Sequence, residues 1–422
     1  MKKFPFNPST LRINIKRLQA NIEELGKIGR NETNGLDRIT FNEFDLEARE
    51  WFKHQLTSLQ LPYKVDAAAN IWTTLGATSL LAPITIGSHL DTVPNGGKYD
   101  GALGILIGLE VLTTLIENNI ETTHPISLVS FTAEEPNPFN LSTFGSRVIT
   151  GKLKKQDIES VHTPSGISLQ TALASAGGSI EQIEAAEVFQ HDIAAFLEVH
   201  IEQGKRLLNK DIPIGIVTAI TGIYREEITF TGEANHAGTT LMTERNDALV
   251  EASKFVVAFE EILRLDPADE VVGTIGQFAI SPGAPNIIPN EVKLLMEVRG
   301  DTRERIRKIL AQLDQTVHEL FEQQPINIHR RIILDQAPTN MDQNVINTFQ
   351  ESVPADVTYL LLGSMAGHDA THLASITKAG MLFVPSIDGK SHCPEEYSKI
   401  EDIEKVANVL LQAIFKLDKK LV

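Results

Sequence analysis

The chain has 422 residues, which is long for a single hydrophobic core, so two domains are the default expectation. Its net charge of −17 argues against nucleic acid and against an anionic membrane surface as partners, because both repel an acidic protein. The one cysteine, Cys393, excludes a disulfide within the chain, and no stretch approaches the roughly 20 apolar residues of a membrane span. The N-terminus has two lysines but no apolar segment after them, so we expect a cytoplasmic protein.

In chain order, helical and strand-like patterns alternate over the first half of the sequence. Apolar residues recur at helical spacing in 10–30 and 40–60, and Thr40 with Glu43 three residues later is typical of a capping box. Alternation of strands and helices favours a parallel α/β sheet. The strand-like runs begin near Leu61, Ile84, Ile126 and Ala194.

The character of the sequence changes near Pro213. Strand-like and helical segments between 214 and 333 indicate a separate α+β domain, after which helix and strand alternate again. We therefore predict a larger α/β domain, with a mixed and mostly parallel sheet flanked by helices, built from 1–213 and 334–422. The smaller domain is then an insertion, which is tolerated when the two ends of the insert lie close together.

A first candidate site follows the run that begins at Ile84. His89 and Asp91 are two residues apart, so on an extended backbone their side chains point to the same side. A metal-binding imidazole usually has its second nitrogen held by a carboxylate or a carbonyl. His89 is therefore a candidate ligand, Asp91 its orienter and Asp100 a second candidate ligand. The alternatives are a helix N-cap for Asp100 and a hydrogen-bonded core histidine for His89.

Two later apolar runs end in the same residue types. One leads into Glu134 and Glu135, and the other contains His200 near its end. Ligands bind at the carboxyl ends of parallel strands in open α/β sheets, so these strand ends favour a site for a hard or borderline cation. Nearer the C-terminus, His368 and His392 lie in loop-like stretches, where an incidental solvated histidine is the alternative.

Nine motifs together resemble the M20 family of metal-dependent amidohydrolases. Within that family the sequence is most similar to the hydantoinase/carbamoylase branch, which includes N-carbamoyl-L-amino acid amidohydrolases, allantoate amidohydrolase and β-ureidopropionase. The resemblance covers nearly the whole length and keeps the family's order of motifs. The motifs are GSHLDT (87–92), NGGKYDG (95–101), TAEE (132–135), EVHIEQG (198–204), GEANHAGTT (232–240), GAPNIIPNEV (283–292), MEVRGD (296–301), AGHDA (366–370) and SHCPEE (391–396).

The resemblance implies two divalent metal ions in each subunit, with zinc expected first and manganese, cobalt or nickel as alternatives. Asp100 would bridge the two ions, because a carboxylate has two oxygens. Glu134 would be the general base that takes a proton from a metal-activated water, and Asp91 would orient His89. The implied metal ligands are His89, Asp100, Glu135, His200 and His392.

Further positions are implied to contact a small carboxylate substrate. Arg299 and Asn286 of the smaller domain would hold the carboxylate, although a surface ion pair is the alternative for Arg299. Gln203 and His368 would contact the carbamoyl end, and His236 would stabilise the developing oxyanion. The resemblance also implies that the smaller domain is a ferredoxin-like lid that pairs with its copy in a homodimer and lends His236 to the neighbour's site.

Two loops depart from the family pattern. Residues 136–138 read Pro-Asn-Pro where many relatives continue with Gly and then an Arg-Phe pair, and Ser364 and Met365 precede the AGHDA motif where relatives commonly show Gly-Ala-Gly. Both loops border the expected site, so they leave the identity of the substrate open.

Three functions are therefore compared. The main hypothesis is hydrolysis of a C–N bond in an N-carbamoyl amino acid or a related ureido acid. The alternative is an M20 aminoacylase or dipeptidase that acts on N-acyl amino acids or short peptides, and it is disfavoured because that branch typically has an acidic residue at the position of His200. A non-catalytic binding protein is disfavoured because such proteins usually lack ligands or the base.

Overall fold

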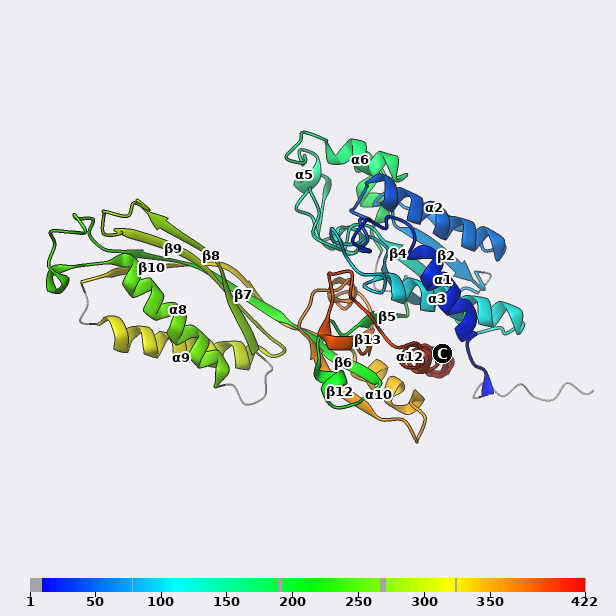
Figure 1. Cartoon of the computed structure of the whole chain (residues 1–422). Coiled ribbons are helices and arrows are strands. Elements are labelled where there is room, and N and C mark those ends of the chain that lie inside the picture. Colours follow the sequence, from blue (N-terminus) through cyan, green and yellow to red (C-terminus); the bar gives the residue numbers. More distant parts are fainter. Residues whose placement is uncertain (1–9, 78, 189–191, 266–270, 323–324, 422) are drawn as a thin grey trace, which may run out of the picture. The chain divides into compact units, whose positions relative to one another are not determined.

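The computed structural model describes residues 10–77, 79–188, 192–265, 271–322 and 325–421 (Figure 1). The chain forms two compact units. The larger unit comprises the chain up to Thr218 together with 340–362 and the segment from Gly367 onward, and the smaller unit comprises Ala219–Thr339 and 363–366.

A nine-stranded sheet forms the centre of the larger unit. Its four central strands, in the order β4-β3-β5-β13, run parallel, and β2 and β6 flank them in antiparallel pairing. Every residue of the four central strands is buried, as expected for parallel strands that are covered on both faces. The strands are β1 (Tyr63–Val65), β2 (Ile71–Leu75), β3 (Ile84–His89), β4 (Ile126–Phe131), β5 (Ala195–Ile201), β6 (Ile214–Ile220), β11 (Thr339–Asn340), β12 (Tyr359–Ser364) and β13 (Ala379–Val384).

Helix α3 (Ala102–Glu117) is almost entirely buried against this sheet. Two glycines allow its backbone to lie close to the strands. A Cβ on Gly104 would lie 2.4 Å from the Val199 carbonyl oxygen, and one on Gly108 would lie 2.5 Å from Leu128 Cδ1. The other helices of the larger unit are α1 (Ile15–Leu25), α2 (Glu43–Ser58), α4 (Phe144–Ile149), α5 (Lys155–Ile158), α6 (Leu169–Ser175), η2 (Ile180–Ala186), α7 (Arg206–Asn209), α10 (Gln343–Ser352), α11 (Ala370–Leu373), η4 (Ile387–Gly389) and α12 (Ile400–Lys420).

Two helix starts differ from simple capping patterns. The cap of α2 is Asn42, whose side chain accepts a hydrogen bond from Asp45 N, so the predicted capping role of Thr40 is wrong. The N-cap position of α3 is Gly101, which has no side chain to cap with, so Asp100 is not a helix cap. Neither Thr40 nor Asp100 caps a helix, and both side chains lie in the candidate site described below.

The smaller unit has four antiparallel strands in the order β10-β7-β9-β8, with helices α8 and α9 on one face (Figure 1). The chain order is strand-helix-strand-strand-helix-strand, which is the ferredoxin-like split βαβ arrangement. Its core joins Phe230, Phe255 and Phe259 to the inner face of β9. The elements are β7 (Gly222–Thr231), η3 (Met242–Glu244), α8 (Ala248–Arg264), β8 (Val271–Ser281), β9 (Glu291–Gly300), α9 (Arg303–Phe321) and β10 (Asn327–Gln336).

The boundaries of this unit are later than the sequence indicated. Strand β6, expected to open the inserted domain, pairs instead with β13 of the larger sheet, with Ile216 opposite Leu382. Six of its seven residues are buried, which suits a strand inside a large sheet. Pro213 therefore marks the start of a strand, and the unit itself begins at Ala219.

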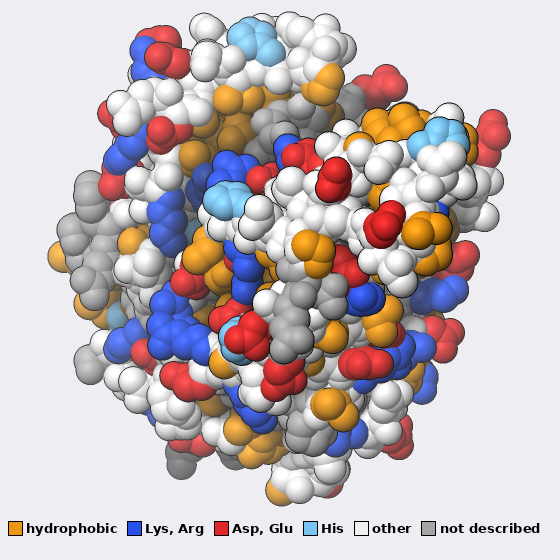
Figure 2. All heavy atoms as spheres, turned by 90° about the vertical axis from the view of Figure 1, so that its left-hand side faces the viewer, with side chains coloured by type: hydrophobic (Ala, Val, Ile, Leu, Met, Phe, Trp, Pro, Cys, Tyr) orange, Lys and Arg blue, Asp and Glu red, His pale blue; other side chains and the backbone are white. Residues whose placement is uncertain are grey.

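The surface carries charges of both signs. Lysine and arginine side chains intermingle with aspartate and glutamate on the face shown in Figure 2, in keeping with 38 Lys and Arg and 55 Asp and Glu in the sequence. Within the residues that the structure describes, no helix is long and apolar enough to cross a lipid bilayer.

Candidate metal centre and active site

Three neighbouring strands of the larger sheet deliver the candidate ligands to one edge. His89 is the last residue of β3 and lies opposite Phe131, the last residue of β4, so the turn with Glu134 and Glu135 begins beside it. His200 is the second-last residue of the parallel strand β5. The carboxyl ends of these strands therefore place imidazole and carboxylate groups together, as predicted for an open α/β sheet.

The ligand atoms form two groups that share one carboxylate. Asp100 Oδ1 lies 3.1 Å from His200 Nε2 and 3.9 Å from His89 Nε2. Asp100 Oδ2 lies 3.3 Å from His392 Nε2, which is itself 3.3 Å from Glu135 Oε1. The groups His89–Asp100–His200 and Asp100–Glu135–His392 each have the compactness that a metal ion requires. Asp100 is the common member, with one oxygen turned to each group.

Two histidines of the first group have the second-nitrogen contacts of metal ligands. His89 Nδ1 lies 3.0 Å from the carbonyl oxygen of Asp91, and His200 Nδ1 lies 3.0 Å from that of Ile201. These contacts orient the rings and turn each Nε2 toward the centre, where Gly101 N donates to His200 Nε2 at 3.2 Å. Among the described residues, His89 Nε2 is buried without a hydrogen-bond partner, so the site fits a cation that this nitrogen would bind.

Gly101 makes the space beside these imidazoles. Its φ of +62° lies in the left-handed region, and a Cβ at this position would lie 2.1 Å from His89 Nε2. Any larger residue would therefore push into the space in front of the His89 ring. Gly101 is required both because its φ is positive and because the His89 ring lies so close to its Cα.

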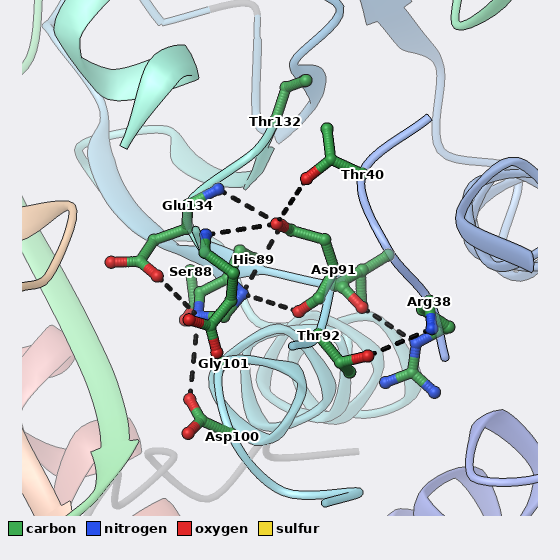
Figure 3. A network of polar contacts seen from close by, with 12 residues as sticks. Arg38, Thr40, Ser88, His89, Asp91, Thr92, Asp100, Gly101, Thr132 and Glu134 are labelled. Carbon is green, nitrogen blue, oxygen red and sulfur yellow. Dashed lines mark hydrogen bonds and ion pairs between the residues drawn. The ribbon is translucent and has the colours of Figure 1, made fainter. Parts of the chain in front are cut away.

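Asp91 has a wider role than orienting His89, as Figure 3 shows. Its Oδ1 lies 3.6 Å from His89 Nδ1 and accepts a hydrogen bond from Glu134 N at 3.3 Å. Its Oδ2 accepts from Glu135 N at 3.2 Å and from the Thr40 hydroxyl at 3.0 Å. One buried carboxylate thus fixes the turn that carries both glutamates, next to Ala133 with its left-handed φ of +57°.

The strand end beneath Asp91 is held by a fully buried arginine. Arg38 Nε donates to the carbonyl oxygen of Leu90 at 2.9 Å, and Arg38 N donates to Thr92 Oγ1 at 3.1 Å (Figure 3). Burial lowers the pKa of Arg38 to about 10, against the nearby Asp45 and Asp91 carboxylates, so the group remains a cation at neutral pH. The positive charge of Arg38 offsets part of the negative charge of these nearby carboxylates.

The electrostatics of the centre suit a cation. Burial raises the pKa of Glu134 well above its usual value, and the neighbouring Glu135 adds to this effect. Burial alone would lower the pKa of His89, but the carboxylates of Glu134 and Asp91 raise it well above the usual value. Hydrogen bonds to Asp100 and Glu135 raise the pKa of His392 to about 10. In this arrangement protons on the imidazoles balance carboxylates that metal ions would otherwise neutralise.

Gln203 contacts the shared carboxylate. Its Nε2 donates to Asp100 Oδ2 at 2.8 Å and lies 3.4 Å from His392 Nε2. Its Oε1 is buried and has no partner within the described part of the chain. Since donating from Nε2 fixes the orientation of the amide, Oε1 is an acceptor that a ligand in the site would satisfy.

His368 and its neighbour Asp369 lie behind the His200 ring. The centroids of the His368 and His200 rings are 4.5 Å apart, and burial together with the His200 charge keeps the pKa of His368 well below its usual value. Burial and the nearby Glu198 raise the pKa of Asp369 to about 8, and its Oδ1 accepts from the Ser146 hydroxyl at 2.5 Å. Burial therefore favours the neutral imidazole of His368, which can both donate and accept a hydrogen bond.

The smaller unit brings two of its predicted site residues together. His236 forms an isolated backbone bridge with Ile287, and Ala237 N donates to Asn286 O at 2.9 Å. His236 is exposed, and its Nδ1 accepts a hydrogen bond from Gly238 N at 3.0 Å. A neutral His236 then carries its proton on Nε2, which makes that nitrogen a donor suited to an oxyanion.

Arg299 lies at the opposite end of the same sheet, where it pairs with Ile223. Its Nε donates to Glu297 Oε1 at 2.7 Å and its Nη1 to the Met365 carbonyl oxygen at 3.3 Å. From Glu291 to Arg299 the strand rises about 27 Å, at roughly 3.4 Å per residue. Asn286 and Arg299 of one chain are therefore separated by most of the length of β9.

Several residues around the centre were not singled out from the sequence. The strongest case is Glu396, buried in the SHCPEE motif, whose carboxylate accepts from Tyr99 N and Asp100 N. Ser391 donates to Asp100 Oδ2 at 2.7 Å. Thr40 was assigned to a helix cap, and Arg38 lies in no recognised motif. The positions of Ser391 and Glu396 in SHCPEE and of Asp369 in AGHDA offered a sequence indication.

Known proteins are similar to this chain over nearly their whole length. The model of peptidase family M20/M25/M40 matches residues 85–416. An N-carbamoyl-L-amino-acid amidohydrolase from Pseudomonas sp. (strain NS671) is 34% identical over 96% of this chain and 99% of its own. An allantoate amidohydrolase from Bacillus subtilis is 33% identical over 94% of this chain and 96% of its own.

A solved structure has the same fold. The crystal structure of a hydantoinase/carbamoylase family amidase from Burkholderia ambifaria superposes with a TM-score of 0.88 at 30% identity, covering 96% of this chain and 98% of that one. The family model, the relatives and this structure agree with the resemblance stated from the motifs. The chain therefore belongs to peptidase family M20/M25/M40 and is similar within it to the hydantoinase/carbamoylase amidases.

Proposed function

We propose that this protein is a metal-dependent amidohydrolase that cleaves a C–N bond of an N-carbamoyl amino acid or a related ureido acid. The observation that carries the proposal is the sharing of Asp100 by two compact ligand groups, beside a second, non-ligand glutamate. Relatives of nearly full-length similarity are N-carbamoyl-L-amino-acid and allantoate amidohydrolases, which supports a ureido rather than a peptide substrate. We also propose a cytoplasmic location, since a lone cysteine leaves no pair for an internal disulfide.

The ligand set favours two divalent ions per chain. Imidazole and carboxylate ligands suit zinc first and also accept manganese, cobalt or nickel. When bound, such ions lower the pKa of a water and polarise the scissile carbonyl. His89 and His200 would hold one ion and Glu135 and His392 the other, with Asp100 common to both.

Glu134 is the proposed general base. Its Oε2 lies 3.6 Å from His89 Nε2, at the centre but outside both ligand groups. The backbone N–H of Glu134 is held by Asp91, so the side chain starts from a fixed point. In the proposed reaction its carboxylate accepts a proton from the attacking water and returns it to the leaving nitrogen.

Gln203 and His368 are the proposed contacts for the carbamoyl end. The unpartnered Oε1 of Gln203 accepts hydrogen bonds, and the NH₂ of a carbamoyl group donates them. An N-acyl group has a methyl or longer alkyl carbon in that place and would leave this acceptor unsatisfied. This difference favours a ureido substrate over an N-acyl amino acid.

Arg299 is the proposed holder of the substrate carboxylate. Glu297 accepts hydrogen bonds from both Arg225 and Arg299, so two guanidinium groups share one carboxylate and a net positive charge remains. Arg299 uses two of its five N–H donors for Glu297 and Met365. Donors therefore remain for a bidentate contact with a carboxylate.

We further propose a homodimer through the smaller unit. Asn286 and His236 lie together, far along the sheet from Arg299, so they serve best in the site of a second chain while Arg299 serves its own. Support for pairing of this unit comes from its exposed apolar surface on α8, where Val250 and Val257 are about half exposed. His236 would then donate from Nε2 to the oxyanion that forms in the partner's site.

A panel of substrates and metals tests the function. Metal-free protein would be loaded in turn with zinc, manganese, cobalt and nickel and assayed with N-carbamoyl-L-amino acids, ureidopropionate and allantoate. N-acyl amino acids and dipeptides are the comparison group. We expect turnover of at least one ureido acid, detected as ammonia release, and little turnover of the comparison group. Turnover confined to N-acyl amino acids or dipeptides would assign the alternative activity.

A further inference from the structure

The carboxylate of Glu396 joins the two loops that carry Asp100 and His392. Its Oε1 accepts hydrogen bonds from Tyr99 N at 2.8 Å and from Asp100 N at 3.0 Å. Its Oε2 lies 3.1 Å from Ser391 Oγ, next to His392 in the chain. The contacts span almost 300 residues of sequence and connect two members of one ligand group.

Ser391 extends this connection to the shared ligand itself. Its hydroxyl oxygen lies 2.7 Å from Asp100 Oδ2 and 3.1 Å from Glu396 Oε2. A hydroxyl has one hydrogen, so the shorter contact assigns that hydrogen to Asp100. Glu396 therefore fixes Asp100 through the backbone N–H of Asp100, and Ser391, which lies beside Glu396, donates separately to the Asp100 side chain.

Glu396 is buried, and Gly97 leaves space for its carboxylate. The residue is 4% exposed, and a Cβ on Gly97 would lie 2.1 Å from its Oε1 and 2.5 Å from its Cβ. Gly97 therefore provides the space through which the carboxylate reaches the Asp100 loop. Burying a carboxylate is costly unless it accepts hydrogen bonds, and here Oε1 accepts two of them from backbone N–H groups. Glu396 belongs to neither ligand group.

We infer that Glu396 is a positioning residue that sets Asp100 and His392 at the separation required by the second metal ion. This inference rests on the proposed metal centre, but not on the identity of the substrate. Partners that orient metal ligands typically change metal affinity by about 10- to 100-fold when they are removed. The ion of the Asp100–Glu135–His392 group should be affected more than that of the His89 group, since only the former depends on both loops.

The test measures metal binding without any substrate. Metal-free protein would be titrated with Co²⁺, whose visible absorption reports coordination, and with Zn²⁺ in competition with a chelator of known affinity. We expect wild-type protein to bind two ions per chain. Glu396→Ala should weaken one of them about 10- to 100-fold and leave the other within a few-fold of wild type.

Conservative and matched variants separate positioning from general damage. In Glu396→Gln, the amide oxygen still accepts from Tyr99 N and Asp100 N, and the amide N–H donates to Ser391, so affinity for both ions should stay within a few-fold of wild type. Glu395→Ala removes the neighbouring exposed glutamate and should bind both ions as wild type does. If Glu396→Gln is as weak as Glu396→Ala, charge rather than positioning is responsible and the inference is overturned.

A second variant disturbs the position of the Glu396 carboxylate without removing it. Gly97→Ala inserts a Cβ into the space that Glu396 occupies and should weaken the same ion, even if Glu396→Ala does not fold. Two ions bound with wild-type affinity by a folded Gly97→Ala or Glu396→Ala protein would overturn the inference, as would a wild type that binds fewer than two. A wild type that binds two ions but hydrolyses no ureido acid would refute the proposed function alone.

Discussion

At the residue scale, the adjacent glutamates Glu134 and Glu135 have different environments although their backbone N–H groups both bond to Asp91. Glu135 lies 3.3 Å from His392 and belongs to a ligand group, whereas Glu134 lies beside His89 and belongs to none. One carboxylate can thus remain on metal while the other stays available for proton transfer. The proposed division of roles would follow from a turn that points the two side chains to different places.

We predict that Glu134→Gln keeps both metal ions but lowers kcat by about 10²- to 10⁴-fold, the usual contribution of a general base. The amide has nearly the same shape but cannot accept the proton. Metal content would be measured beside kcat on the same preparation. Glu135→Gln is the matched control and should lose metal together with activity; the reverse pattern would show that the two roles are exchanged.

The second prediction concerns the substrate carboxylate. Methyl esters or amides of a good substrate should lose about 10- to 100-fold in kcat/KM, which corresponds to roughly 1.5–3 kcal/mol for one charge-assisted hydrogen bond. In Arg299→Ala, acid and ester should be turned over at similar, low rates, because the group that distinguishes them is gone. Equal kcat/KM for acid and ester in the wild type would contradict the assignment.

Local sequence patterns predict the site residues that follow apolar runs, and they fail for residues whose partners are distant. His89, Glu135 and His200 each follow or end such a run, so their convergence at one sheet edge follows from strand direction alone. Arg38 and Glu396 are defined by contacts across 52 and 296 residues, which no periodicity encodes. Their roles depend on the packed tertiary structure.

At the scale of elements, the ligand edge is supported by helix α3, which begins directly after Asp100 and Gly101. Glu110 of this helix is completely buried and bonds to Arg17 of α1 through two hydrogen bonds of 2.7 and 2.8 Å. Asn14 N and the Thr114 hydroxyl donate to the same carboxylate. The pair connects the outer helix α1 to the helix that carries the metal-ligand turn.

We predict that Arg17→Ala lowers the free energy of unfolding by about 3 kcal/mol, because it leaves a buried carboxylate without its cation. Urea unfolding followed by tryptophan fluorescence measures this in the larger unit, since both tryptophans, Trp51 and Trp72, lie there. Adding Glu110→Gln should recover part of the loss by removing the charge.

The matched control uses the second acidic partner of Arg17. Glu117 also pairs with Arg17 at 2.7 Å, but its side chain is 54% exposed. Glu117→Gln should change stability by less than about 1 kcal/mol, as exposed ion pairs usually do. If Glu117→Gln costs as much as Arg17→Ala, burial of Glu110 is not the source of the effect.

Element prediction succeeded where one pattern dominates and failed where two patterns compete. The amphipathic helices α8 and α9 lie within 214–333, where helical segments were expected. The start of α2 was misplaced because Asn42 offers a cap two residues after Thr40, and both satisfy the same local rule. The inserted unit was begun too early because a proline opens the buried strand β6, which belongs to the larger sheet by pairing and not by composition.

At the scale of the whole molecule, the substrate-binding residues proposed for the smaller unit lie at two ends of its sheet. His236 and Asn286 belong to one end of this sheet, and Arg299 belongs to the other, about 27 Å away along β9. A substrate of a few ångströms cannot touch both ends of one chain. If all three act on one substrate, two chains must contribute, and a two-fold dimer exchanges the same residues in both directions.

The final prediction uses this division to sort residues by complementation. Two nearly inactive variants, Glu134→Ala and His236→Ala, would be unfolded, mixed and refolded. Random pairing makes about half of the dimers mixed, and each mixed dimer regains one complete site, so roughly a quarter of all sites should recover. Activity of the mixture of Arg299→Ala with His236→Ala should recover to the same extent. In the proposed dimer, each site takes Arg299 from its own chain and His236 from the other chain.

Two further mixtures should stay inactive. Arg299→Ala with Glu134→Ala removes two residues that serve the same chain's site, and Asn286→Ala with His236→Ala removes two that are lent together, so neither mixture restores a complete site. Refolded wild type measures the yield, and the dimer is verified by light scattering. Recovery in none of the four mixtures, with dimers present, would return His236 to a role within its own chain. Recovery in all four would contradict the proposed assignment of these residues to the two chains.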